Sequence, residues 1–155
     1  MTDYPIHPIG RVESTLTDVA EAPNQAGSGA PPAWLVLDPA LSEGARDIRP
    51  GQQILVLTWL HLSPRDELST VPGDDPGGPE RGVFSTRSPN RPNPVGLHPA
   101  TVLAVQPGRI QVSSLEVVDG CPVDDLQRTH LDASRLHGEH RRRVQIGRAS
   151  CRERV

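Results

Sequence analysis

Short apolar runs separated by turn-forming residues dominate this chain. The longest, residues 54–62 (ILVLTWLHL), is apolar or β-branched almost throughout, as buried strands often are. A Gln106–Pro107–Gly108 turn stands between two further runs, which are therefore predicted to form a hairpin. The strands predicted from the pattern cover residues 6–12, 33–37, 54–62, 82–86, 95–105 and 109–118.

No helical period is sustained along the sequence. One short helix is predicted over residues 38–47, because Asp38 can cap its first turn and Pro39 suits the first helical position. Both tryptophans and Phe84 lie within apolar runs, and we expect them to fill the core. The pattern predicts a mostly antiparallel β protein, a sandwich or a small barrel, with at most one or two short helices.

Composition indicates one domain without a membrane span. The chain has 155 residues, within the range of a single domain, and 35% of them are hydrophobic. Its 14 Gly and 17 Pro disfavour long helices and favour strands joined by turns. No charged segment precedes an apolar stretch at the N-terminus, so no signal peptide is expected. The 2 cysteines predict neither a disulfide framework nor a metal site, and we expect a cytoplasmic protein.

The charge is unevenly distributed along the chain. Residues 1–127 contain 8 Arg and 16 acidic residues, whereas the remainder contains 8 Arg and 3 acidic residues. A basic tail on an acidic body can indicate an arm that binds nucleic acid. However, residues 145–155 read like a translated sequencing adapter, with Ile146–Val155 matching ATC GGA AGA GCG TCG TGT AGG GAA AGA GTG. We therefore predict a domain over 1–127, an unassigned segment over 128–144 and an artefact over 145–155, the alternative being a natural Arg-rich tail.

A proline-rich segment, residues 82–97 (GVFSTRSPNRPNPVGL), does not fit a core strand. Three prolines between positions 89 and 94 fix φ and remove three backbone donors, which predicts a stiff loop. Such a loop would hold Arg87 and Arg91 in place at a low entropic cost, as suits a bound carboxylate or phosphate. The alternative is an ordinary stiff connection whose arginines pair with the acidic body.

A second segment, residues 113–122 (SSLEVVDGCP), ends in an Asp119–Gly120 turn. Its carboxylates, Glu116 and Asp119, can hold a cation or a pair of hydroxyls, although carboxylates at a strand end are often merely solvated. His61, at the end of the most apolar run, is either a hydrogen-bonded structural residue or a catalytic one.

These two segments carry a resemblance. GVFSTRSPNRPNPVGL followed by SLEVVDGCPVDDL resembles the signature of the TsaA-like family, the tRNA methyltransferase O group. IGRVES and APNQAG resemble that family's first strand and its Pro-Arg-Gln-like segment, so the match runs from about Ile9 to Leu126. The resemblance implies a single antiparallel β-barrel that forms homodimers and binds S-adenosylmethionine. It also implies methylation of N6 of threonylcarbamoyladenosine at position 37 of a tRNA.

The family's motifs imply site residues at matching positions. For the cofactor these are Pro23, Asn24, Gln25, His61, Leu62, Arg87, Leu97, Ser113, Ser114, Leu115 and Glu116. Asn24 stands where the family has Arg, Leu62 where a polar residue is common, and Gln127–Thr129 (QRT) where Lys-Pro-Tyr is usual. These departures put the side-chain contacts at positions 24 and 62 and the C-terminal edge in question.

The same residues suggest roles in methyl transfer. Backbone groups of 113–116 can pair with an adenine edge, and Arg87 can hold an anionic group or pack on the adenine. Arg91 and Asn93 are the predicted substrate-binding residues. Asp119 is the first candidate for the base that accepts the N6 proton, and His61 is the second.

Three functions stay open from the sequence. The first is tRNA methylation dependent on S-adenosylmethionine. The second is a non-catalytic barrel that binds the cofactor or RNA, and the third is an inactive truncated fragment. The acidic body weighs against strong RNA binding by one chain, because phosphate neutralisation supplies most nonspecific affinity. A basic groove formed across a dimer would remove that objection.

Overall fold

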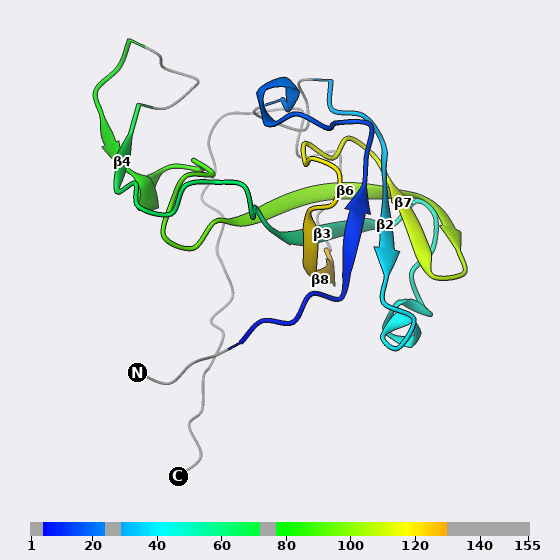
Figure 1. Cartoon of the computed structure of the whole chain (residues 1–155). Coiled ribbons are helices and arrows are strands. Elements are labelled where there is room, and N and C mark those ends of the chain that lie inside the picture. The colour runs from blue at the N-terminus through cyan, green and yellow to red at the C-terminus, as the bar shows by residue number, and fades with distance from the viewer. Residues whose placement is uncertain (1–4, 24–28, 72–76, 130–155) are drawn as a thin grey trace.

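Six strands pair edge to edge into a closed antiparallel barrel (Figure 1). They are β1 (Gly10–Glu13), β2 (Ala33–Leu37), β3 (Gln53–Trp59), β6 (Val95–Gln106), β7 (Arg109–Val112) and β8 (Pro122–Arg128). The computed structural model describes residues 5–23, 29–71 and 77–129. Around the ring the order is β1, β2, β7, β6, β3, β8, and β8 pairs with both β3 and β1. The mostly β prediction is confirmed, and the closed ring selects the barrel over the sandwich.

Alternate residues of the strands fill the barrel. In β2 and β3 every second side chain is buried, as a pleated strand with one face on a core requires. Each buried Val, Leu or Ile side chain stabilises the fold by about 1.5–3 kcal/mol. The enclosed aliphatic residues of this core include Val12, Leu35, Ile54, Val56, Val102, Ile110, Val112, Leu115, Val117 and Val123.

The long strand β6 joins the two halves of the barrel. Its first part, up to Thr101, pairs with β3, and its second part, from Val102, pairs with β7. The β6–β7 hairpin confirms the predicted one, and Gly108 adopts a φ of 73° in its turn. The proline-rich loop enters β6 at the opposite end from this turn (Figure 1).

The strand predicted over residues 82–86 is wrong. Only β5 (Arg81–Gly82) is extended there, and it pairs with β4 (Ser69–Thr70) in a small hairpin that projects beside the barrel (Figure 1). The chain then turns into the 3-10 helix η4 (Val83–Ser85). Arg91 donates to the carbonyls of Val83 and Thr86, so these carbonyls serve the proline-rich loop and not a sheet.

The aromatic side chains do not take the core positions expected for them. Val83 is fully buried, and successive side chains of a 3-10 helix point about 120° apart. Phe84 therefore faces outward and is 79% exposed. Both tryptophans lie on outward positions of β2 and β3, with an arginine guanidinium 4.4 Å from one indole and 5.2 Å from the other.

The helix predicted over 38–47 is only a 3-10 helix, η3 (Ser42–Ala45). The Asp38 carboxylate accepts the N–H of Ala40 at 2.8 Å, which forms a local turn in place of a helix cap. With η1 (Val19–Glu21), the described residues hold three such helices, one more than predicted, and no α-helix. Within these same residues, no helix has the length and apolar character needed to cross a membrane.

The C-terminal part of the barrel differs from the predicted strands. The run over 109–118 ends early, because β7 stops at Val112 and Ser114 adopts a left-handed φ of 44°. β8, absent from the prediction, has two adjacent acidic residues and a single buried side chain, Val123, so its sequence carries little alternation. Residues 130–155, including the segment that resembles an adapter, lie outside the described residues.

Candidate functional site

Several of the predicted cofactor residues meet where β6 begins. Arg87, in the proline-rich loop, donates from Nη2 to the carbonyl of Leu97 in β6 at 2.9 Å. Glu116, on the loop after β7, meets the same strand through His98, whose Nδ1 lies 3.1 Å from Glu116 Oε1. The charge of Arg87 also acts on the Glu116 carboxylate. Segments far apart in sequence thus place a guanidinium and a carboxylate in one cluster.

His61 and Leu62 lie at the same end of the barrel, on the turn after β3. Leu60 donates its N–H to the carbonyl of Pro94 at 2.8 Å, which ties this turn to the start of β6. His61 is exposed and Leu62 is 59% exposed, so both side chains are open to solvent.

Arg87 keeps donors free for a ligand. Apart from its contact with Leu97, the guanidinium makes no hydrogen bond or ion pair within the described residues. The alternative that this arginine pairs with the acidic body is therefore not seen there. Arg87 can present unused N–H groups to a carboxylate or to an aromatic face.

Arg91 is used differently. Its Nε donates to the carbonyl of Ser88 at 2.7 Å, and its Nη2 donates to Val83 at 2.9 Å and Thr86 at 2.6 Å. These three bonds connect parts of the proline-rich loop to one another, which adds to the restriction that its prolines impose. The geometry gives Arg91 a structural task, while its substrate contact stays a prediction.

The carboxylate of Glu116 sits in a buried polar row. Thr58 Oγ1 lies 2.9 Å from His98 Nε2, and Thr58 and His98 are 0% and 5% exposed. Burial alone would raise the pKa of Glu116, but the hydrogen bond from His98 outweighs it together with smaller contributions from the Glu116 backbone and from the charges of His98 and Arg87, so the pKa lies below its usual value. Glu116 Oε2 is buried and has no hydrogen-bond partner among the described residues.

Thr58 and His98 were missed by the sequence reasoning, which considered only His61 among the histidines. The available signal was strand alternation, since His98 occupies an inward position of β6, two residues after Gly96. A Cβ on Gly96 would lie 2.2 Å from His98 Nε2 and 2.5 Å from Thr58 Oγ1, so only glycine fits beside the pair.

Two of the backbone N–H groups of residues 113–116 are already used within the fold. The N–H of Ser113 donates to Thr101 at 2.9 Å, and that of Leu115 donates to Pro31 at 3.0 Å. Leu115 is fully buried, so its side chain belongs to the core. The N–H of Ser114 has no partner among the described residues, and the left-handed backbone there turns it out of the strand.

Asp119, the first candidate base, holds a loop together. Its Oδ1 accepts the N–H of Ser14 at 3.0 Å, and its own N–H donates to Leu16 at 2.7 Å. The other oxygen has no partner among the described residues and lies in an exposed position, so the catalytic role stays a prediction beside this structural one. Pro23 is half-buried, and Asn24 and Gln25 lie outside the described residues.

A groove of about 590 Å³ lies at the start of β6. Asn93, the other predicted substrate residue, lines it together with Trp59, Val95 and Asp124. Leu97, whose carbonyl accepts from Arg87, follows Val95 by two residues on the same face of β6. Asp124 falls at a β-bulge in β8; burial raises its pKa, and Oδ2 has no partner among the described residues.

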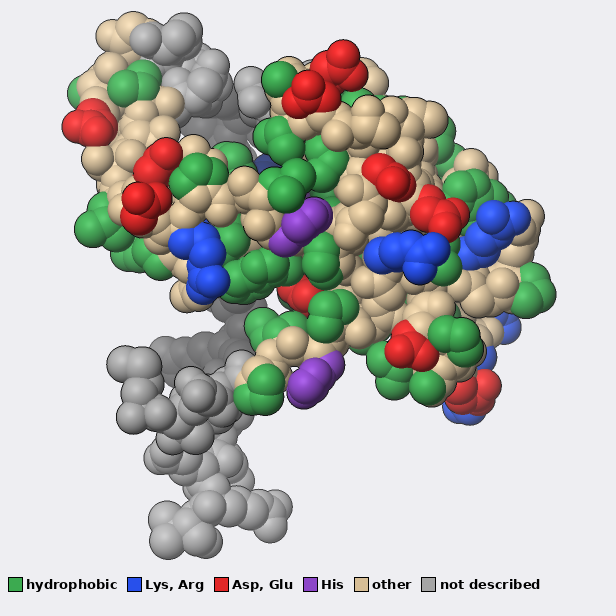
Figure 2. All heavy atoms as spheres, viewed as in Figure 1, with side chains coloured by type: hydrophobic (Ala, Val, Ile, Leu, Met, Phe, Trp, Pro, Cys, Tyr) green, Lys and Arg blue, Asp and Glu red, His purple; other side chains and the backbone are tan. Residues whose placement is uncertain are grey.

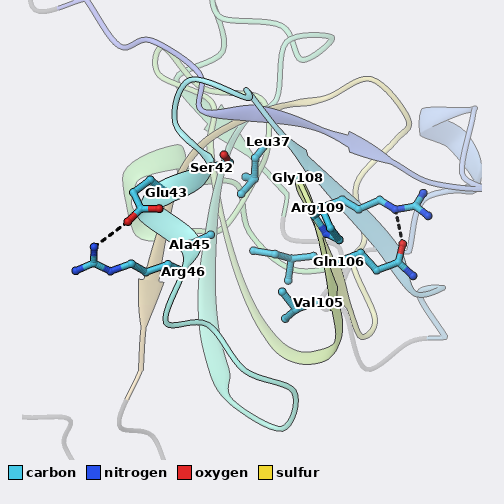
Figure 3. Close-up of a pocket in the computed structure, with 11 residues that line it drawn as sticks. Leu37, Ser42, Glu43, Ala45, Arg46, Val105, Gln106, Gly108 and Arg109 are labelled. Carbon is cyan, nitrogen blue, oxygen red and sulfur yellow. Dashed lines mark hydrogen bonds and ion pairs between the residues drawn. The ribbon is translucent and has the colours of Figure 1, made fainter.

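A second hollow, of about 450 Å³, lies at the far end of β6 by the hairpin turn (Figure 3). Arg46 binds Glu43 at 2.8 Å and Arg109 binds Gln106 at 2.8 Å, so its charged side chains are already engaged. None of the predicted site residues lines it. No group of three or more metal-ligating side chains gathers in 5–23, 29–71 or 77–129.

Comparisons with known proteins agree with this fold. A protein of Archaeoglobus fulgidus named S-adenosyl-L-methionine-binding protein is 37% identical over 79% of this chain and 87% of its own length. A Methanothermobacter thermautotrophicus protein named probable S-adenosyl-L-methionine-binding protein is 36% identical, over 84% of this chain and 93% of its own.

Crystal structures of proteins titled TrmO share the fold. One from Pseudomonas aeruginosa superposes with a TM-score of 0.65 at 23% identity, covering 83% of this chain and 56% of that one. Another gives 0.68 at 24% identity, covering 96% of this chain and 64% of that one. This chain thus spans less than two thirds of the crystallised proteins. The family described as the tRNA-methyltransferase O N-terminal domain matches residues 11–131, and the chain belongs to that family.

Proposed function

We propose that this chain binds S-adenosylmethionine beside Arg87 and Glu116 and transfers its methyl group to an adenosine of tRNA. The proposed acceptor is N6 of threonylcarbamoyladenosine at position 37. Family membership and relatives named for S-adenosylmethionine binding support the cofactor and the tRNA substrate. One structural observation carries the proposal: near Arg87, which makes a single hydrogen bond among the described residues, lies a buried carboxylate with one oxygen that has no partner among them.

The cluster fits the chemistry of this cofactor. S-Adenosylmethionine carries a carboxylate, an ammonium group, ribose hydroxyls and an adenine edge. Arg87 can donate to the carboxylate or stack on the adenine, Glu116 Oε2 can accept from the ammonium or a hydroxyl, and Ser114 N–H can meet a ring nitrogen. The proposed cofactor set is completed by Pro23, Asn24, Gln25, His61, Leu62, Leu97, Ser113 and Leu115.

The groove beside Leu97 is the proposed place of the acceptor base. Trp59 provides an aromatic wall, and aromatic walls favour nucleobases because every base has a π-face. Asn93 lines this groove, and its side-chain amide can pair with a base edge. Arg91 contributes by holding the loop that presents Asn93.

Bound S-adenosylmethionine supplies an electrophilic methyl group on a sulfonium. The chain's part is to hold the acceptor nitrogen in line with the S–CH₃ bond, and such positioning can supply most of the acceleration. The fixed loop and the barrel rim suit that task because their hydrogen bonds restrain them. Asp119 and His61 stay the proposed acceptors of the N6 proton.

Binding of tRNA is proposed to need two copies of the chain. Figure 2 shows arginine side chains in separate clusters among acidic ones on the visible face, without a continuous basic surface. Phosphate binding relies on grouped positive charge. A homodimer would place arginines of both copies along one RNA.

The names of the relatives favour a second candidate, a barrel that binds the cofactor without catalysis. Calorimetry with S-adenosylmethionine and transfer of its radiolabelled methyl group to tRNA separate the two. Binding with transfer to tRNA that carries threonylcarbamoyladenosine supports the enzyme, and binding without transfer supports the binding module. Absence of binding refutes both and leaves an inactive fragment.

A further inference from the structure

The row from Thr58 through His98 to Glu116 links three strand and loop segments inside the barrel rim. Its two contacts are 2.9 Å and 3.1 Å long, and its members come from β3, β6 and the loop after β7. Thr58 is 0% exposed, and its hydroxyl has His98 Nε2 as its partner. At the other end of the row, Glu116 Oε2 is buried and has no partner among the described residues.

The chemistry of the row sets its direction. An ionised carboxylate only accepts hydrogen bonds, so His98 Nδ1 carries the proton that Glu116 Oε1 receives. The Thr58 hydroxyl can donate to Nε2 or accept from it, so this second contact is compatible with either form of the ring. Gly96 packs directly against this contact, because a Cβ there would lie 2.2 Å from His98 Nε2.

The surroundings keep this arrangement stable. Arg87 is the charged group that acts on Glu116 from the proline-rich loop. On the other side, the Cys121 thiol donates to the carbonyl of Trp59 at 3.1 Å. Burial raises the pKa of Cys121 to about 11, so a neutral thiol lies near Thr58.

We propose that His98 is a positioning residue, which holds the Glu116 carboxylate in one orientation so that Oε2 accepts a hydroxyl or ammonium group of the bound cofactor. The inference rests on the proposed cofactor site. An unpartnered buried carboxylate oxygen is costly, and a bound donor would satisfy it. Without the imidazole, the carboxylate would rotate towards Arg87, and Oε2 would no longer be oriented to accept a hydrogen bond from the cofactor.

Two amide substitutions at His98 distinguish the contribution of Nδ1 from that of Nε2. The side-chain amide of His98→Asn lies near the place of Nδ1 and can still donate to Glu116, whereas that of His98→Gln reaches towards Thr58. Calorimetry should find S-adenosylmethionine binding about ten-fold or more weaker in His98→Gln, with most of the affinity retained in His98→Asn. His7→Gln, at an exposed position, is the matched control and should bind like the wild type.

A double-mutant cycle tests whether His98 acts through Glu116. If it does, Glu116→Gln binds weakly and adding His98→Gln weakens it little further, because both remove the same interaction. Imidazole ¹⁵N NMR should find Nδ1 protonated in the wild type and a shifted His98 signal when the cofactor is added. The shift should vanish in Glu116→Gln, an effect that loss of stability alone does not produce.

A second ligand identifies the group that Oε2 meets. 5′-Methylthioadenosine keeps the ribose but lacks the ammonium, so an equal loss in His98→Gln assigns the ribose hydroxyls. A loss confined to S-adenosylmethionine assigns the ammonium. Unchanged affinity for both ligands in a folded His98→Gln overturns the positioning role alone, and a wild type that binds neither ligand overturns the cofactor site with it.

Discussion

Replacing Gly96 by Ala tests the buried row through its tightest contact. The added methyl would lie 2.2 Å from His98 Nε2 and 2.5 Å from Thr58 Oγ1, far inside van der Waals distance. Overpacking of this kind costs about 1–3 kcal/mol, and a displaced Thr58–His98 hydrogen bond adds about 0.5–1.5 kcal/mol. Reduced backbone entropy of the unfolded Ala chain returns about 0.4–1 kcal/mol. We expect a net loss of about 2–3 kcal/mol in the free energy of unfolding.

Urea denaturation of the full chain measures this loss, with Gly44→Ala as the control. A Cβ at Gly44 meets no atom within 4 Å, so the control should be neutral or slightly stabilising. In a His98→Ala background, Gly96→Ala should cost less by about 1 kcal/mol or more, because the nearest clashing atom is gone. A loss below about 0.5 kcal/mol in the single variant would refute the close packing of Gly96 against the imidazole.

Four further predictions concern the site and the tail. Arg87→Ala should weaken S-adenosylmethionine binding by about 1.5–3 kcal/mol by calorimetry, with partial recovery in Arg87→Lys; unchanged affinity in both would make this arginine structural. Asp119→Asn keeps an oxygen for the loop contact and should stay folded, while turnover falls about 10²–10⁴-fold if Asp119 accepts the proton; full activity would leave it the structural role alone. The pKa of Glu116 is lowered by folding, so its stabilisation is present above the usual value of 4.5 and lost as the pH falls through the folded value; Glu116→Gln should flatten that part of a stability–pH curve. Deleting residues 145–155 should leave the melting temperature and cofactor affinity unchanged, and a drop of several degrees would mean that the segment packs on the domain.

Local sequence patterns predicted the parts of the fold whose structure depends on neighbouring residues. β2 matches its predicted bounds, and the β6–β7 hairpin follows from its Pro-Gly turn. β8 was not predicted, because its pairing with β1 and β3 defines it as a strand more than its own apolar residues do. Strand alternation cannot indicate a strand whose interior side consists largely of one residue, Val123.

The site divides in the same way. The stiffness of the proline-rich loop could be predicted because proline restricts its own backbone, but the bonds of Arg91 to three carbonyls could not. His98 and Glu116 are 18 residues apart and meet only because β6 and the loop after β7 share the barrel rim. Contacts that form only when the six strands close into the barrel leave no local pattern in the sequence.

The two carboxylates of the 113–122 segment have unequal claims to chemistry. One oxygen of Asp119 accepts the N–H of Ser14, and the side chain is exposed to solvent. A carboxylate there is well hydrated, so its ionisation costs little free energy. Glu116 is largely enclosed, its pKa is lowered by the hydrogen bond from His98, and its Oε2 has no partner in the part of the chain that the structure describes. Burying a charge is unfavourable unless something compensates it, so a carboxylate kept ionised in this way points to a bound donor. Sequence reasoning gave the catalytic part to Asp119 and only a binding part to Glu116, and the geometry makes Glu116 the better starting point for experiments on this site.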